Sequence, residues 1–266
     1  MQLSRALLAA ALMTLPLALP AEARNITAST SEDTDMARAQ HTEWTRLLEK
    51  YVHASDDGVN RVDYGALKSN PADMAALDAY IAGFAGMDLS GSDNAAFAAW
   101  ANLYNAVTVR YIAQKYPIDS IRDGHIFGGP WKRIIVTAGG RDVSLDDIEH
   151  RILRPTFNDP RVHYAINCAA FSCPNLMHKA WEPATLDRDI DAAARAYVNN
   201  PRGVTVTDRG LVVSSIYDWF LADFGGSKQS VIDHLLKYAD TGLASQIRAK
   251  PKIRSHDYDW SLNDTQ

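Results

Sequence analysis

The segment from Asp93 to Tyr116 constrains the fold more than any other part of this sequence, because its pattern is that of a helix with apolar side chains on nearly every side. These side chains are Phe97, Trp100, Leu103, Tyr104, Val107, Val109, Tyr111 and Ile112. A helix of this kind has to be covered by other elements on most of its faces. Pro117 predicts its end, because proline cannot continue a helix. We therefore predict a central helix around which the rest of the chain packs.

The order of the other predicted elements indicates the fold class. Helical periodicity is found over residues 36–53, 72–87, 145–153, 184–198, 216–226 and 228–239. Strand patterns occur at 133–140, 161–168 and 252–263, and a hairpin is predicted around Asp208-Arg209-Gly210. Ser144 and Asp147 form a capping-box pattern before the helix at 145–153, and Pro155 predicts its end. Because the helices come early and the strands late, we predict an α+β fold with a helix-rich N-terminal half packed on a mainly antiparallel sheet.

The first 23 residues have the layout of a secretory signal peptide. Arg5 supplies the positive charge, residues 6–19 are apolar, and Ala21-Glu22-Ala23 is a small-x-small cleavage pattern. The apolar run is shorter than the ~20 residues that a membrane-spanning helix needs. We therefore predict an exported protein, periplasmic or secreted, with no integral membrane segment after cleavage. Residues 24–35 are predicted to be a flexible leader, and residues 36–266 a single compact domain.

The charge pattern narrows the class of partner. The net charge is −5 at pH 7, and acidic and basic residues are interspersed along the chain. A basic stripe is the usual mark of a protein that binds nucleic acid or anionic membranes, and this sequence has none. We therefore expect no nucleic-acid partner, and expect a small-molecule or peptide substrate instead. The oligomeric state is not predicted.

The stretch RVHYAINCAAFSCPNLMH holds both cysteines of the chain between His163 and His178. Structural zinc sites usually pair cysteines with two to four residues between them, and the spacing of Cys168 and Cys173 is at that limit. Thiols of exported proteins also tend to oxidise rather than bind zinc. We therefore predict no metal and no cofactor here.

The cysteines themselves allow two interpretations. A pair of cysteines in an oxidising compartment favours a disulfide between Cys168 and Cys173, which would be a short local clip. A catalytic site would instead use Cys168 as nucleophile, His163 as base, and Asn167 to orient the base or stabilise an oxyanion. In an extended strand His163 and Asn167 share one face and Cys168 has the other, so the strand would have to end or bulge at Asn167. The residues alone leave both interpretations open.

Two asparagines in the predicted central helix indicate where a pocket would lie. Asn102 and Asn105 are three residues apart and so share a helix face. A buried amide has to be hydrogen-bonded. The two amides either join a polar network with the strand at 161–168 or bond loop backbone and position it. We predict a polar pocket where this helix meets the strand that ends at Cys168.

Several stretches together resemble the family called domain of unknown function 547: WANLYNAVTVRYI, RDVSLDDIEHRILRPTFNDPRVHYAINCAAFSCPNL, IYDWFLADFG and YDWSLND. The resemblance spans residues 44–263 and indicates an exported bacterial member, but it implies no established reaction. It places seven residues at motif positions of the family, namely Asn102, Asn105, Glu149, His163, Asn167, Cys168 and Cys173. The family pattern has glycine where this chain has Ala169, so a turn with positive φ there would be strained.

Two functions follow as hypotheses. The first is a cysteine-dependent amide hydrolase or acyl transferase, with binding roles for Asn102, Asn105, Glu149 and Cys173. A helix packed on a sheet that carries the histidine would be analogous to papain-like and transglutaminase-like enzymes, although there cysteine precedes histidine. Plant relatives have serine at the position of Cys173, which favours Cys168 as the functional thiol. The second is a non-catalytic exported binding or assembly module with a Cys168–Cys173 disulfide.

Overall fold

The computed structural model describes residues 31–125 and 129–265. The predicted signal peptide and residues 24–30 of the predicted leader lie outside the described residues. Helix α1 (Ser31–Tyr51) begins at Ser31 rather than near Met36. Residues 31–35 of the predicted leader are thus helical.

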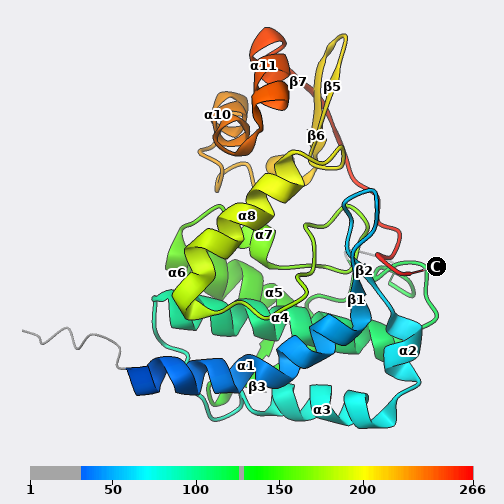
Figure 1. Cartoon of the computed structure of the whole chain (residues 1–266), viewed down its shortest axis with the longest axis vertical. Coiled ribbons are helices and arrows are strands. Elements are labelled where there is room, and N and C mark those ends of the chain that lie inside the picture. The colour runs from blue at the N-terminus through cyan, green and yellow to red at the C-terminus, as the bar shows by residue number, and fades with distance from the viewer. Residues whose placement is uncertain (1–30, 126–128, 266) are drawn as a thin grey trace, which may run out of the picture.

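Helix α4 (Asn94–Lys115) is the central element, as its apolar pattern predicts. Asp93 caps it by accepting a hydrogen bond from the backbone N–H of Ala96, and its middle turns are buried on all sides. Helices α2 (Tyr64–Lys68), α3 (Pro71–Ala82) and α5 (Leu145–Asp147) pack against it, and α1 packs on α3 (Figure 1). The Asp93 cap sets where the helix begins, and its all-round apolar surface explains why the other helices pack against it.

The strands of the described residues form three small sheets rather than one. β1 (Val52–His53) pairs with β2 (Arg61–Val62), and β3 (Ile135–Ala138) pairs with β4 (Arg141–Ser144). In the third sheet β5 (Val204–Thr207) and β6 (Gly210–Ser214) form the predicted antiparallel hairpin, and β7 (Ile253–Asp257) adds parallel to β6. Mixed helix and strand confirm the α+β class. The prediction that the N-terminal helices pack on an antiparallel sheet is wrong, because they pack on α4.

The best strand candidate of the sequence, residues 161–168, is not a strand. Its first part is the short helix α7 (Val162–Ala165), after which Ile166 is extended. Asp159 starts this turn, because its carboxylate accepts from the backbone N–H of Arg161 and its carbonyl accepts from that of Val162. The predicted alternation of faces along this segment is therefore wrong as well.

The remaining helices lie in the second half of the chain. They are the 3₁₀ turn η2 (Pro183–Thr185), α8 (Leu186–Val198), α9 (Ile216–Trp219), α10 (Lys228–Tyr238) and α11 (Thr241–Ala249). Figure 1 shows α8 running from the layer of α4 toward the group formed by α10, α11 and the three-stranded sheet. One continuous cluster of buried apolar side chains reaches from Leu47 on α1 to Ile232 on α10. In the described part of the chain, no helix has the length and apolar character that crossing a membrane requires.

Candidate functional site

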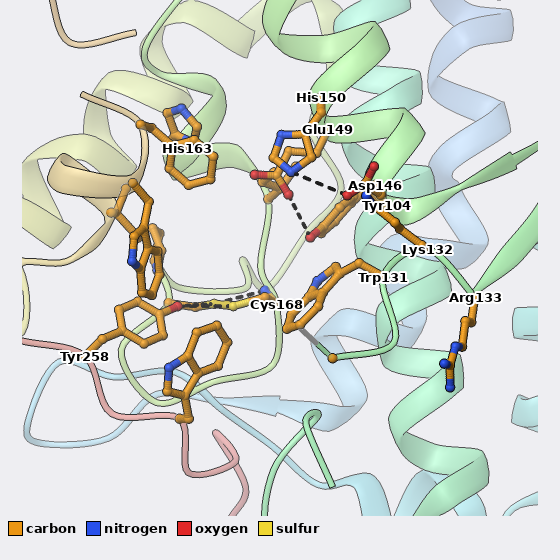
Figure 2. Close-up of a pocket in the computed structure, with 18 residues that line it drawn as sticks. Tyr104, Trp131, Lys132, Arg133, Asp146, Glu149, His150, His163, Cys168 and Tyr258 are labelled. Carbon is orange, nitrogen blue, oxygen red and sulfur yellow. Dashed lines mark hydrogen bonds and ion pairs between the residues drawn. A yellow bond between two sulfur atoms is a disulfide. The ribbon is translucent and has the colours of Figure 1, made fainter. Parts of the chain in front are cut away.

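A cavity of about 520 Å³ lies where segments far apart in the sequence meet. Tyr104 of the central helix lines it, together with side chains of the turn η1 (Ile148–Leu153), of α7 and of α9, both cysteines, and the C-terminal segment. The cavity has an aromatic wall and a polar wall (Figure 2). Pockets of this size and mixed character are typical of small-molecule sites.

The aromatic wall consists of side chains in mutual contact. The ring centroids of Trp219 and Tyr258 are 4.7 Å apart, those of Tyr258 and Trp260 are 4.7 Å apart, and those of Trp131 and Trp260 are 5.8 Å apart. The Trp219 side chain is nevertheless 48% exposed. An exposed tryptophan that lines a cavity leaves apolar ring surface in contact with water, and a bound ligand would cover that surface. Trp219 is therefore a candidate ligand contact.

The polar wall begins at the helix that Ser144 caps. Ser144 and Asp147 form the predicted capping box, and α5 then widens into the π-helical turn η1 (Ile148–Leu153). Pro155 does not end the helix as predicted, because it lies in the first turn of α6 (Arg154–Phe157), where its missing N–H costs little. Widened turns of this kind are frequent at functional sites. Here the turn directs Glu149 into the protein and toward the cavity.

Glu149 is the most perturbed acid of the cavity. Its side chain is buried, and its Oε2 atom accepts a hydrogen bond of 3.2 Å from the Tyr104 hydroxyl. Burial raises the pKa of the Glu149 carboxyl from 4.5 to about 7, and the Tyr104 hydrogen bond offsets only part of this rise. Glu149 is therefore neither a surface residue nor an ordinary carboxylate. A near-neutral pKa in a cavity is a common property of functional acids.

His163 lies in the same wall, held by Asp223. Its Nε2 atom is 2.7 Å from Oδ2 of Asp223, and its ring stacks on Phe220 with centroids 4.0 Å apart. Arg154 donates two hydrogen bonds of 2.6 and 3.0 Å to the same carboxylate. Burial lowers the pKa of His163, although Asp223 opposes this, so a neutral imidazole donates to Asp223 near pH 7. Asp223, rather than Asn167, orients His163.

Cys168 and Cys173 are joined by a disulfide that lies in the cavity wall. Cys173 is drawn back by a turn in which its N–H donates to the carbonyl of Ala170, and Ala169 has the strained φ of 63° that its place in the motif predicts. The Tyr258 hydroxyl is 3.1 Å from each sulfur atom. Of the two interpretations of the cysteines, the structure has the disulfide, and Cys168 is not a free thiol.

The predicted asparagines form the frame of the site rather than its surface. Asn105 donates to the carbonyl of Ala165 at 2.9 Å and accepts from the backbone N–H of Asn167 at 2.8 Å. The Asn167 side chain donates to the Pro174 carbonyl and accepts from the N–H of Ala169. Asn102 makes the corresponding pair of bonds with the backbone of Trp181. All three amides hold loop backbone in place, and none of them lines the cavity.

The two histidines of the Cys-containing stretch do not converge. His178 bonds the carbonyl of Val52 on β1, whereas His163 bonds Asp223. Within residues 31–125 and 129–265, no cluster of three or more His, Cys, Asp or Glu side chains has an arrangement that could hold a metal ion.

Several residues of the site were not predicted from the sequence. They are Tyr104, Trp131, Trp219, Phe220, Asp223, Tyr258 and Trp260. Most lie in the stretches IYDWFLADFG and YDWSLND. The sequence pattern of these stretches predicted an amphipathic helix and a closing strand. That interpretation did not indicate that their side chains line a cavity. Their high aromatic content was the available signal.

Comparison with protein families matches residues 89–198 to the family described as "Protein of unknown function, DUF547". No curated protein matches the chain, and no solved structure does. The analogy to papain-like and transglutaminase-like enzymes assumed a histidine on a sheet strand, and His163 lies on the short helix α7 instead. The matched segment includes Tyr104, Glu149, His163 and both cysteines. Over residues 89–198, which supply most of the polar wall of the cavity, this chain matches the family of unknown function DUF547.

Proposed function

We propose that this protein is a binding module whose cavity takes a small organic ligand with a flat ring. The observation that carries the proposal is the aromatic wall, in which the exposed Trp219 stands beside Tyr258 and Trp260. Aromatic side chains bind the faces of planar rings and the apolar faces of sugars. The Cys168–Cys173 disulfide then serves as a clip that holds the floor of the cavity. Export to an oxidising compartment, as the signal pattern indicates, is part of this proposal.

The C-terminal segment supports the role of the disulfide as a clip. The N–H of Phe171 donates to the carbonyl of Ser261, and the N–H of Ser172 donates to that of Asp259. These bonds fasten the loop between the cysteines to the segment that carries Tyr258 and Trp260. The disulfide therefore stabilises the aromatic wall through the backbone as well as through the Tyr258 hydroxyl.

Loss of Trp219 is expected to weaken ligand binding about five- to tenfold, which corresponds to the roughly 1–1.5 kcal/mol of one aromatic contact. The probe is 8-anilinonaphthalene-1-sulfonate, titrated into the native protein and followed by its fluorescence. Ile135→Ala is the matched control, because Ile135 is also an exposed large apolar residue, 49% exposed on β3, and does not line the cavity. Equal affinities of Trp219→Ala and the wild type, or no binding by the wild type, would contradict the proposal.

A cysteine-dependent amide hydrolase or acyl transferase is the second candidate. The observation in its favour is that Cys168 and His163 line the same cavity. It requires reduction of the disulfide, and it requires His163 to serve Cys168 while its Nε2 atom bonds Asp223. The thiolate is the nucleophile in such enzymes, so the oxidised protein would be inactive.

Iodoacetamide is expected to leave both cysteines of the native protein unlabelled until a reductant is added. After reduction, Cys168 should label before Cys173, because Cys173 is only 2% exposed. Peptide mass spectrometry reads both results. Labelling of Cys168 without reductant would show a free thiol and favour the second candidate over the first.

A further inference from the structure

The Glu149 carboxyl is placed to meet a ligand that the aromatic wall holds. Figure 2 shows it between the His163 and Tyr104 side chains, above the disulfide and facing the cavity. Its Oε2 atom is bonded to Tyr104, and its Oε1 atom has no protein hydrogen-bond partner among the described residues. Glu149 lines the cavity, so a molecule bound there can donate a hydrogen bond to this second oxygen.

We infer that Glu149 is a proton-transfer group, which accepts a proton from, or donates one to, a ring-shaped ligand lying on Trp219, Tyr258 and Trp260. The inference rests on the proposed ligand site and adds an activity to it. A buried carboxyl beside a bound ring needs no metal and no thiol to act as a general base or acid. Tyr104 is then a positioning residue, since its hydroxyl holds one oxygen of the carboxyl.

The charged groups around Glu149 set the pH range of this activity. Tyr104 faces it from α4, Asp146 from α5, Arg154 from α6 and Asp223 from the turn after α9. Burial raises the pKa of Glu149 most, Tyr104 and then Arg154 lower it, and the two aspartates raise it slightly. The sum places the pKa at about 7. The carboxyl can therefore give and take a proton at neutral pH.

A reaction that needs only a base beside an aromatic ring tests this inference without knowledge of the natural ligand. In 5-nitrobenzisoxazole, the Glu149 carboxylate would take the ring C–H proton. The C–H electron pair then forms the nitrile, and the N–O bond breaks with its electrons on oxygen. The product is a coloured cyanonitrophenolate, and Glu149 returns its proton to water. No oxidant, reductant or cofactor takes part.

The expected rate rises with pH to a plateau, with a midpoint near the pKa of about 7. Glu149→Gln should lower the rate about a hundredfold, the lower end of what a positioned base contributes. Glu49→Gln, on the exposed face of α1, is the control for surface carboxylates and should keep the wild-type rate. Tyr104→Phe should keep the reaction but move the midpoint to higher pH, because it removes the hydrogen bond that favours the carboxylate.

Quenching of tryptophan fluorescence by the same compound separates the possible failures. If the compound quenches but Glu149→Gln reacts as fast as the wild type, the proton-transfer role is overturned while ligand binding stands. If Glu149→Gln does not fold, an unchanged midpoint in Tyr104→Phe overturns it equally. If the compound neither quenches nor reacts, the binding proposal fails and this inference fails with it.

Discussion

Glu149→Gln is expected to stabilise the protein relative to the wild type by an amount that grows to roughly 3 kcal/mol as the pH rises through neutrality. The cause is the folded-state pKa of about 7, against 4.5 in an unfolded chain. Between these values the folded protein still holds a proton that the unfolded chain has lost. Wild-type stability is therefore highest, with respect to this group, below about pH 4.5, and is lost as the pH rises through about 7. Glutamine resembles the protonated acid and removes this loss.

Urea unfolding of both proteins at about pH 5 and about pH 8 measures the effect. At each pH, the free energy of unfolding of the wild type is subtracted from that of Glu149→Gln. The change in this difference between the two pH values is the quantity that tests the prediction. Glu49→Gln, exposed on α1, is measured in parallel to account for the loss of one carboxylate from the chain. A difference between Glu149→Gln and the wild type that does not grow with pH would show that Glu149 ionises as it does in water.

Asn105→Leu is expected to destabilise the protein by roughly 2–4 kcal/mol, although it makes the central helix more apolar. The substitution leaves the buried Asn167 N–H without a partner and removes one of two donors from the buried Ala165 carbonyl, at about 1–3 kcal/mol each. The Ala165 carbonyl keeps the indole N–H of Trp181 as a second donor, so its share lies at the low end. Asn105 is 3% exposed, so water cannot replace the lost amide.

Asn94→Leu is the matched control, because it makes the same change at an exposed position of the same helix. Denaturant unfolding of the two variants at one pH compares them directly. We expect Asn94→Leu to lie within about 0.5 kcal/mol of the wild type. A similarly small effect of Asn105→Leu would contradict the frame that joins α4 to the loop before Cys168.

Much of the secondary structure could be predicted because it depends on local patterns. The all-round apolar surface of α4, its Asp93 cap, the Ser144–Asp147 capping box and the hairpin of β5 and β6 are each encoded within a few neighbouring residues. The strand predicted at residues 161–168 was wrong because that prediction, too, used only the local pattern. Its apolar run suits a strand, but no strand of the described residues pairs with it, and Asp159 starts a helical turn instead.

The candidate site could be predicted only in part. Its cysteines, His163 and Glu149 lie within one matched segment, residues 89–198. Their partners come from elsewhere in the chain: Tyr104 binds Glu149 from 45 residues away, and Asp223 binds His163 from 60 residues away. Periodicity carries no information about such pairs.

The sequence by itself determined that this chain builds an α+β protein around one buried helix and that residues 89–198 match a family of unknown function. Its N-terminus has the pattern of an export signal, and export stays a prediction. Only the tertiary structure decided that the cysteines are bridged, that the asparagines hold backbone, and that the aromatic C-terminal segment lines one cavity together with Glu149. The physical reason is range. Caps, turns and amphipathic faces arise from residues a few positions apart, whereas burial, pKa shifts and cavities arise from groups that meet only after the chain has folded.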